Sequence, residues 1–272
     1  MQEYTSFASV YDKFMDNVPY EEWAEYVISI LHQYSIEDGL VCDLGCGTGS
    51  LTEILAAKGY DMIGIDMSVD MLDEAMKKRD QSGADILYLC QDMREMELYG
   101  TVRAIVSICD SMNYILDADD MAQVARLACN YLDYDGIFIF DMNTEYKYRE
   151  VLSDNTFAEN RSDAAFIWEN TYDEETRINE YALTLFIKEN ADEGVGDDDC
   201  GSDEEYDYSD DGKERFVRFT EYHEQRAYSI EEVKKMLTDA GLIVEGVYDA
   251  FTFEEPRTES ERVYFVARRP QP

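Results

Sequence analysis

A glycine-rich stretch at residues 40–52, LVCDLGCGTGSLT, constrains the fold of this chain more than any other segment. A short apolar run ends at Asp43, and glycines then alternate at Gly45, Gly47 and Gly49 before helix-forming residues resume. Glycine adopts positive backbone dihedral angles without a Cβ clash and allows backbone amides to approach a ligand closely. We therefore predict a strand, a tight turn and a helix whose free amide groups point at a nucleotide-type ligand.

The details of this turn bear on which nucleotide is bound. A dinucleotide fingerprint has the spacing G-x-G-x-x-G, whereas here Ser50 stands where the third glycine is expected. Asp43 would repel a pyrophosphate, but its carboxylate can accept hydrogen bonds from the ammonium group of an amino-acid moiety, directly or through water. A second predicted strand, 60–65, ends at Asp66, an acid that dinucleotide enzymes also use for ribose hydroxyls. Together these features favour S-adenosylmethionine, which carries an ammonium group and no phosphate.

The motif VCDLGCGTG resembles the first motif of the class I S-adenosylmethionine-dependent methyltransferases. The runs VYDKFM, PYEEW and CDSMNY are similar to a narrower group, the YqeM-like methyltransferases, which brings no substrate with it. The resemblance implies that S-adenosylmethionine is bound by Tyr11, Trp23, Asp43, Gly45, Cys46, Gly47, Gly49, Asp66, Met67, Met71, Gln91, Asp92, Met93, Cys109 and Asp110.

Several of these residues have a particular role in the family. The resemblance implies that Tyr11 and Trp23, on N-terminal helices, close over the methionine end of the cofactor. Met67 and Met71 lie where an apolar wall for adenine is expected, and Asp92 matches an acid that hydrogen bonds the adenine amino group. Core packing is the alternative for Trp23 and the two methionines, and a solvated loop acid is the alternative for Asp92.

Strand and helix patterns alternate along the first half of the chain. Apolar helix faces are predicted at 4–16 and 20–33, and strands alternate with helices from residue 40 to Asp141. This order predicts an α/β fold with a doubly wound, mostly parallel sheet. The resemblance implies a Rossmann-like sheet of seven strands, in which the last strand, 262–267, is antiparallel and inserted between strands five and six.

The periodicity changes after the fifth strand. Residues 165–172, 180–188 and 216–228 alternate between apolar and polar, which predicts an inserted antiparallel sheet. In similar methyltransferases such a sheet covers the acceptor pocket. The predicted domains are the N-terminal helices over the cofactor site (1–36), the cofactor-binding domain (37–152 and 229–272) and the antiparallel lid (153–228), which contains a disordered acidic loop (189–214).

Methyl transfer mainly requires that donor and acceptor are oriented and that water is excluded. A base is needed only if the acceptor must lose a proton early, as a hydroxyl does. His223 shares one face of a predicted lid strand with Glu221 and Gln225, so it is the candidate base, with a structural hydrogen bond as the alternative. Asn113, at the end of a central strand, and Tyr11 complete the predicted catalytic residues.

Composition limits the partners of the chain. Its 272 residues carry a net charge of −38, which disfavours a nucleic-acid substrate because such proteins normally present a basic face. CDSMNY also lacks the N-P-P-Y run associated with methylation of base amino groups. The chain has six cysteines but no C-x-x-C pair, and only two histidines. We therefore expect reduced thiols, no metal site and a cytoplasmic protein. We also expect no membrane span, because the apolar runs are too short.

We therefore expect a methyltransferase that uses S-adenosylmethionine and acts on a small molecule. A sugar-amine N-methyltransferase and a non-catalytic protein that binds S-adenosylmethionine or has a regulatory role are the alternatives, and a dinucleotide oxidoreductase is disfavoured by Asp43 and the missing third glycine. The sequence leaves the acceptor and the choice between monomer and homodimer open.

Overall fold

The structure is a computed structural model that describes residues 19–188 and 214–272, so Tyr11 and most of the predicted acidic loop lie outside the described residues. Strands and helices alternate along the first part of the chain as α2 (Tyr20–Gln33), β1 (Gly39–Leu44), α3 (Ser50–Ala57), β2 (Tyr60–Asp66), α4 (Val69–Ser82), β3 (Ile86–Cys90), η1 (Met93–Glu95), β4 (Val102–Ser107), η2 (Ser111–Tyr114), α5 (Ala118–Tyr131) and β5 (Leu132–Asn143). The second part contains η3 (Lys147–Leu152), β6 (Thr156–Asn160), β7 (Ala164–Asp173), β8 (Ile178–Lys188), β9 (Phe216–Arg226), α6 (Ile230–Asp239), β10 (Ile243–Asp249) and β11 (Arg262–Arg268).

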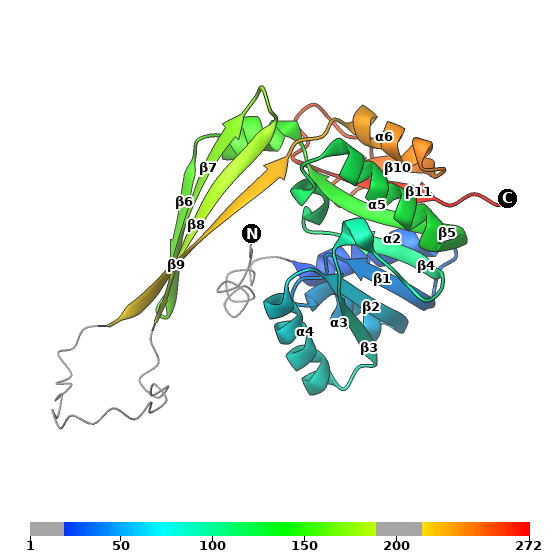
Figure 1. Ribbon diagram of the computed structural model, residues 1–272, viewed down its shortest axis with the longest axis horizontal. Helices are drawn as coiled ribbons and strands as arrows, with labels where there is room; N and C mark the ends of the chain where they lie inside the picture. The colour runs from blue at the N-terminus through cyan, green and yellow to red at the C-terminus, as the bar shows by residue number, and fades with distance from the viewer. Residues whose placement is uncertain (1–18, 189–213) are drawn as a thin grey trace.

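The main sheet has seven strands in the order β10-β11-β5-β4-β1-β2-β3. Strand β11 runs antiparallel to both β10 and β5, whereas the other pairings are parallel. Figure 1 shows this sheet with helices on both sides. The predicted fold class, including the antiparallel last strand between the fifth and sixth, is confirmed.

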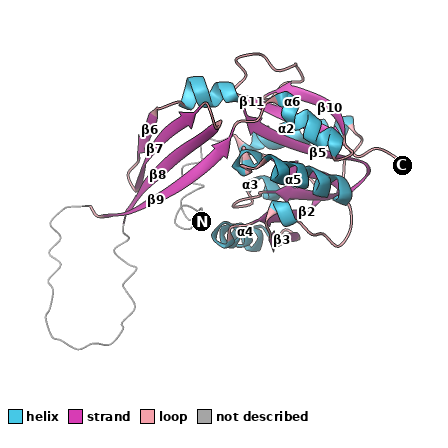
Figure 2. Ribbon diagram, turned by 45° about the horizontal axis from the view of Figure 1, so that its top comes forward, coloured by secondary structure: helices cyan, strands magenta, loops and turns pink. Residues whose placement is uncertain are grey.

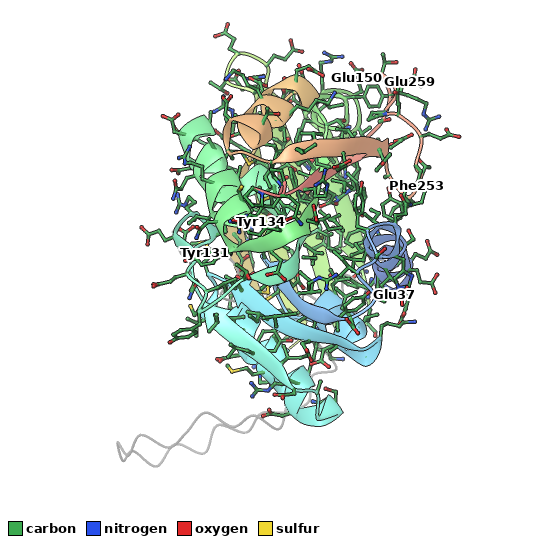
Figure 3. All side chains as sticks on the ribbon, turned by 90° about the vertical axis from the view of Figure 1, so that its right-hand side faces the viewer. Glu37, Tyr131, Tyr134, Glu150, Phe253 and Glu259 are labelled. Carbon is green, nitrogen blue, oxygen red and sulfur yellow. The ribbon has the colours of Figure 1, made fainter. Side chains whose placement is uncertain are left out.

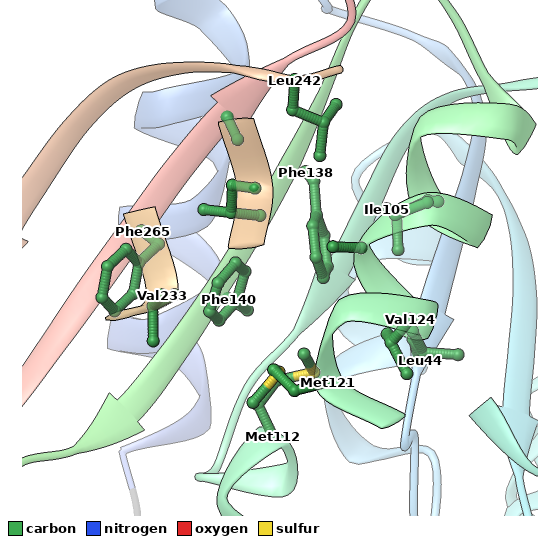
Figure 4. Close-up of a cluster of buried hydrophobic side chains, with 14 of the residues drawn as sticks. Leu44, Ile105, Met112, Met121, Val124, Phe138, Phe140, Val233, Leu242 and Phe265 are labelled. Carbon is green, nitrogen blue, oxygen red and sulfur yellow. The ribbon is translucent and has the colours of Figure 1, made fainter. Parts of the chain in front are cut away.

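Two apolar cores cover the two faces of this sheet. On one face, α5 and α6 pack against Phe138 and Phe140 of β5 and Phe265 of β11, and the rings of Phe140 and Phe265 are stacked 5.0 Å apart (Figure 4). On the other face, α2 and α3 pack against Ile137 and Ile139 of β5. Because successive strand residues point to opposite faces, the alternation along β5 separates the two cores.

The inserted residues form a separate four-stranded antiparallel sheet in the order β6-β7-β8-β9, which we call the lid. Figure 2 shows it projecting from one end of the main sheet, and β9 leads back to α6, which packs on that sheet. The sequence patterns predicted β7, β8 and β9 but not β6, a five-residue edge strand with exposed residues at alternate positions. Helix α6 begins with a capping box between Ser229 and Glu232.

Many acidic side chains lie on the surface. Figure 3 shows Glu37, Glu150 and Glu259 at the periphery of the molecule, and all three are exposed. Solvated carboxylates keep a protein dispersed and repel polyanions. Among the helices that the structure describes, none is long and apolar enough to cross a membrane.

Candidate active site

A cavity of about 260 Å³ lies where β1, β2 and β4 end at their carboxyl edges. This is the edge at which open α/β sheets bind ligands. The structure brings together at this cavity most of the residues predicted to bind the cofactor, namely Asp43, Gly45, Cys46, Gly47, Asp66, Met67, Met71, Gln91, Met93 and Cys109.

The glycine turn is fixed by hydrogen bonds to the next strand. The backbone amides of Gly45 and Cys46 donate to the carbonyl of Ile65 at 2.7 and 2.9 Å. Gly47 has a φ of 54°, in the left-handed region, and a Cβ at this position would meet no atom within 4 Å. The turn therefore exposes bare backbone to the cavity at Gly47, as close approach of a ligand requires.

Gly49 has a different reason to be glycine. It precedes α3 with a φ of 73°, and a Cβ here would lie 2.4 Å from the Tyr88 hydroxyl oxygen and 3.0 Å from the Ala75 Cβ. Gly49 does not line the cavity. Its role is to let the glycine turn pack against β3 and α4.

Asp43 is buried beneath the turn and faces the cavity. Burial raises the pKa of its carboxyl group to about 7, a donated hydrogen bond from Thr52 opposes this rise, and the nearby carboxylate of Asp66 adds to it. The Thr52 Oγ1 lies 2.6 Å from the Asp43 Oδ2. A buried carboxylate is stabilised by a cation that enters the cavity, so Asp43 suits a ligand with an ammonium group.

Asp66 ends β2 and closes the turn from the other side. Its Oδ2 accepts the backbone N–H of Gly47 and its Oδ1 accepts the backbone N–H of Ser68, both at 2.8 Å. Burial raises its pKa, and these backbone hydrogen bonds oppose the rise. A carboxylate offers about four acceptor positions, so Asp66 retains capacity for hydroxyl groups of a ligand.

Besides Gly49, three further predicted cofactor residues lie outside the cavity and have structural contacts. Trp23 is buried, stacks on Phe251 and lies beneath the guanidinium of Arg262. Asp92 accepts hydrogen bonds from the Arg94 side chain, which lower its pKa, and its Oδ1 also accepts the backbone N–H of Arg94, which caps η1. Asp110, the third, binds Arg262 at 2.6 Å and does not reach the cavity.

Two predicted catalytic residues also lie away from the cavity. Asn113 is fully buried, accepts the Asn143 N–H at 2.9 Å, and donates to the carbonyls of Asn143 and Arg226 at 3.2 and 2.9 Å. These contacts tie η2 to β5 and β9, so the geometry gives Asn113 a structural role. His223 is buried on the lid, where its ring stacks on Tyr181 with centroids 4.7 Å apart.

The surroundings of His223 connect the lid to the cavity. Its Nε2 lies 3.4 Å from the Glu221 Oε2, and the ring of Tyr114 stands edge-on to it at 6.0 Å. The hydroxyls of Tyr114 and Tyr181 are hydrogen bonded to each other. Because Tyr114 lines the cavity, this pair of tyrosines joins the cavity to the lid.

Sequence reasoning missed part of the cavity wall. The signal for Tyr114 was present, because it ends the CDSMNY run at the carboxyl end of β4. Thr48 and Ser50 were not distinctive as residue types, yet their hydroxyls accept hydrogen bonds from Lys78 at 3.0 and 2.8 Å. The additional residues at the cavity are Tyr20, Thr48, Ser50, Leu51, Ile65, Ser68, Val69, Asp70, Ile108, Ser111 and Tyr114.

Comparison with known proteins decides the family. The profile of a family described as methyltransferase domain matches residues 41–136. The chain is 34% identical to "Putative methyltransferase YqeM" of Bacillus subtilis (strain 168) over 98% of this chain and 97% of that protein. The chain belongs to the YqeM-like methyltransferase family.

Solved structures extend this likeness to the whole fold. The YqeM-like chain is similar to an S-adenosylmethionine-dependent methyltransferase from Clostridium acetobutylicum ATCC 824, with a TM-score of 0.81, 27% identity, and coverage of 98% of this chain and 99% of the other. It shares its fold with CalS10, an amino pentose methyltransferase from Micromonospora echinaspora whose structure holds S-adenosylmethionine, with a TM-score of 0.70, 17% identity and coverage of 96% of each chain. The enzyme is therefore an S-adenosylmethionine-dependent methyltransferase.

Proposed function

We propose that this YqeM-like methyltransferase binds S-adenosylmethionine in the cavity and methylates a small molecule held between the cavity and the lid. The observation that carries the proposal is the hydrogen bond between Tyr114, which lines the cavity, and Tyr181 of the lid. It places lid side chains beside the cavity that contains the glycine turn. An acceptor bound against those side chains lies next to the cofactor.

The residues around the cavity fit the cofactor. Asp43 would accept hydrogen bonds from its ammonium group, and Asp66 would accept them from the ribose hydroxyls. Met67 and Met71 supply polarisable apolar surface for adenine. When bound, S-adenosylmethionine supplies a methyl carbon already activated by its positive sulfur, so the protein's task is to orient the acceptor and keep water out.

Tyr181 lies on the face of the lid that contacts Tyr114, which we call the inner face. The strand register places Trp168, Asn170 and Tyr172 of β7, Asn179, Tyr181 and Leu183 of β8, and Glu221, His223 and Gln225 of β9 on this inner face. Along the described strands, the same face of β7, β8 and β9 presents no lysine or arginine. An inner face with a carboxylate and no fixed cation favours an acceptor that is neutral or positively charged.

His223 and Glu221 are placed so that the imidazole can accept a proton from the acceptor. An amine must be unprotonated when its lone pair attacks the methyl carbon, and the product loses a proton to become neutral again. An imidazole beside a carboxylate can accept that proton, because the carboxylate stabilises the charged ring. We therefore assign His223 the role of proton acceptor, with Glu221 as the group that orients it.

A sugar amine is the acceptor class that the inner face fits best. Asn170 Nδ2, Asn179 Oδ1 and Trp168 Nε1 are buried and have no hydrogen-bond partner among the described residues. Each unpaired buried polar group is costly, so an acceptor with several hydroxyl groups would be stabilised there. The fold shared with an amino pentose methyltransferase agrees with this assignment.

The test is production of S-adenosylhomocysteine by the full-length enzyme with matched acceptors. An amino sugar is compared with the same sugar carrying a hydroxyl in place of the amine, and with a sugar acid. We expect turnover with the amino sugar, and we expect Tyr181→Phe to reduce it while Tyr222→Phe, exposed on the outer face of β9, does not. Turnover only with anionic acceptors would overturn the proposed acceptor class, and binding of S-adenosylhomocysteine without turnover of any of these acceptors would favour the non-catalytic alternative.

A further inference from the structure

Two consecutive residues after β4 have strained backbone conformations. Cys109 and Asp110 have φ values of 64° and 54°, in the left-handed region, and neither is glycine. Such conformations persist only where surrounding contacts hold them. Cys109 lines the cofactor cavity, so whatever holds Asp110 in place also fixes one wall of that cavity.

Three elements hold Asp110. Its backbone N–H donates to the Asp141 Oδ1 of β5 at 3.0 Å, and its Oδ1 accepts from the Arg262 Nη2 of β11 at 2.6 Å. Arg262 also binds the other oxygen of Asp141, so the two carboxylates share one guanidinium. The third contact comes from the lid, where the Gln225 Nε2 donates to the Asp110 Oδ2 at 2.7 Å.

The other end of the Gln225 amide is also fixed. Its Oε1 accepts a hydrogen bond from the Tyr148 hydroxyl at 3.1 Å, and both side chains are buried. Tyr148 belongs to η3, which connects the main sheet to the lid, and its ring stacks on Tyr172 of β7. Figure 1 shows β9, which carries Gln225, running from the far end of the lid to the main sheet.

We propose that Gln225 is a positioning residue that couples binding of the cofactor at Cys109 to docking of the lid through Asp110. The coupling rests on the proposed function, because it requires S-adenosylmethionine to occupy the cavity. A cofactor that holds Cys109 in position stabilises the Asp110 conformation, and that conformation presents the carboxylate to Gln225. Coupling of this kind is reciprocal, so a docked lid increases cofactor affinity as much as the cofactor increases docking.

Gln225→Leu removes both hydrogen bonds at similar side-chain volume. Glu224→Gln is the matched control, because Glu224 is the preceding residue of β9 and pairs with Glu180 on the opposite face. We expect Gln225→Leu to weaken binding of S-adenosylhomocysteine about tenfold, measured by calorimetry, while Glu224→Gln binds as the wild type does. Tyr148→Phe removes only the hydroxyl that orients the Gln225 amide, and we expect an intermediate loss.

Hydrogen exchange of the full-length proteins separates coupling from a general loss of stability. In the wild type, S-adenosylhomocysteine should slow exchange in β9 and η3 as well as in the glycine turn. In Gln225→Leu at saturating S-adenosylhomocysteine, the turn should still be protected while β9 and η3 exchange as they do without ligand. If Gln225→Leu does not fold, Tyr148→Phe decides by the same measurements.

The outcomes distinguish the two proposals. If Gln225→Leu and Tyr148→Phe both bind S-adenosylhomocysteine with the affinity of the wild type, and both show the lid protection of the wild type, the coupling is overturned. The proposed function is then left intact. A wild type that binds no S-adenosylhomocysteine overturns the proposed function, and the coupling with it. Loss of affinity together with loss of lid protection in the Gln225 variant supports the coupling.

Discussion

The Thr52 hydroxyl donates a hydrogen bond to the Asp43 carboxylate at 2.6 Å, and both side chains are buried beneath the glycine turn. Thr52 belongs to the first turn of α3, so the helix that begins after the glycines also orients the acid that precedes them. The bond gives a buried carboxylate one neutral donor and no cation among the contacts that the structure describes. We therefore expect a cationic ligand to favour the ionised form of Asp43.

Cofactor binding should depend on pH through Asp43. Its pKa of about 7 means that the carboxyl is mostly protonated below pH 7 in the cofactor-free protein, whereas an ammonium ligand requires the carboxylate. The affinity for S-adenosylhomocysteine should rise by up to about tenfold per pH unit between pH 5 and 7. Calorimetry across this range should show the rise in the wild type. Asp43→Asn should bind more weakly with little pH dependence, and an equal pH dependence in both proteins would contradict this assignment.

The same carboxylate should lower the stability of the cofactor-free protein at neutral pH. Because the pKa of Asp43 in the folded state, about 7, lies above the ordinary aspartate value of 3.8, the contribution of Asp43 to stability is fully present below pH 3.8 and is lost as the pH rises through 7. Asp43→Asn should raise the free energy of unfolding by about 2 to 4 kcal/mol at pH 8 and change it little at pH 4. Urea unfolding at both pH values measures the difference. If Asp43→Asn is less stable than the wild type at pH 8, the prediction is contradicted.

Two glycines of the turn should respond differently to alanine. A Cβ at Gly49 would lie 2.4 Å from the Tyr88 hydroxyl oxygen, so Gly49→Ala should lower the free energy of unfolding by about 2 to 4 kcal/mol. A Cβ at Gly47 would face open space in the cavity, so Gly47→Ala should cost only about 1 to 2 kcal/mol from its backbone conformation. Gly47→Ala should nevertheless bind S-adenosylhomocysteine much more weakly. Thermal unfolding and calorimetry on both variants check this, and equal destabilisation would show that the packing argument fails.

An ion pair fastens the lid to α6. Arg177, in the turn between β7 and β8, donates two hydrogen bonds to Glu232 at 2.7 and 2.8 Å, which lowers the pKa of Glu232 to about 2. The contribution of this ion pair to stability is present above the usual glutamate pKa of 4.5 and is lost as the pH falls toward 2. Because Glu232 is more than one-third exposed, Arg177→Gln should lower the free energy of unfolding by only about 1 kcal/mol at pH 7 and by less at pH 3. Lys234→Gln, which breaks a more exposed pair with Glu231, is the control and should change little.

The local parts of the site could be predicted from the sequence. The strand, glycine turn and helix depend on residues 39–57, and the capping box of α6 depends on Ser229 and Glu232, which lie three residues apart. Helix α2 has the bounds that its apolar spacing predicted. In each case the contacts that stabilise the element lie within or next to it, so the residue pattern contains the information.

Contacts between distant elements could not be predicted in this way. Asp110 was expected at the cofactor, but two successive positive φ values direct its side chain to Arg262, which lies 152 positions further along the chain. Neither Cys109 nor Asp110 is glycine, so the sequence gives no sign of this backbone turn. Trp23 lies on the predicted apolar face of α2, yet which partner covers it depends on the loop that carries Phe251. Its exclusion from the cavity is therefore a property of the tertiary fold.

The central claim is that the cavity at the glycine turn binds S-adenosylmethionine. The most direct measurement is calorimetric titration of the full-length protein with S-adenosylhomocysteine and, separately, with NAD. We predict one site per chain for S-adenosylhomocysteine and no detectable heat for NAD, because Asp43 favours an ammonium group and repels a pyrophosphate. Binding of NAD, or of neither ligand, would contradict the account.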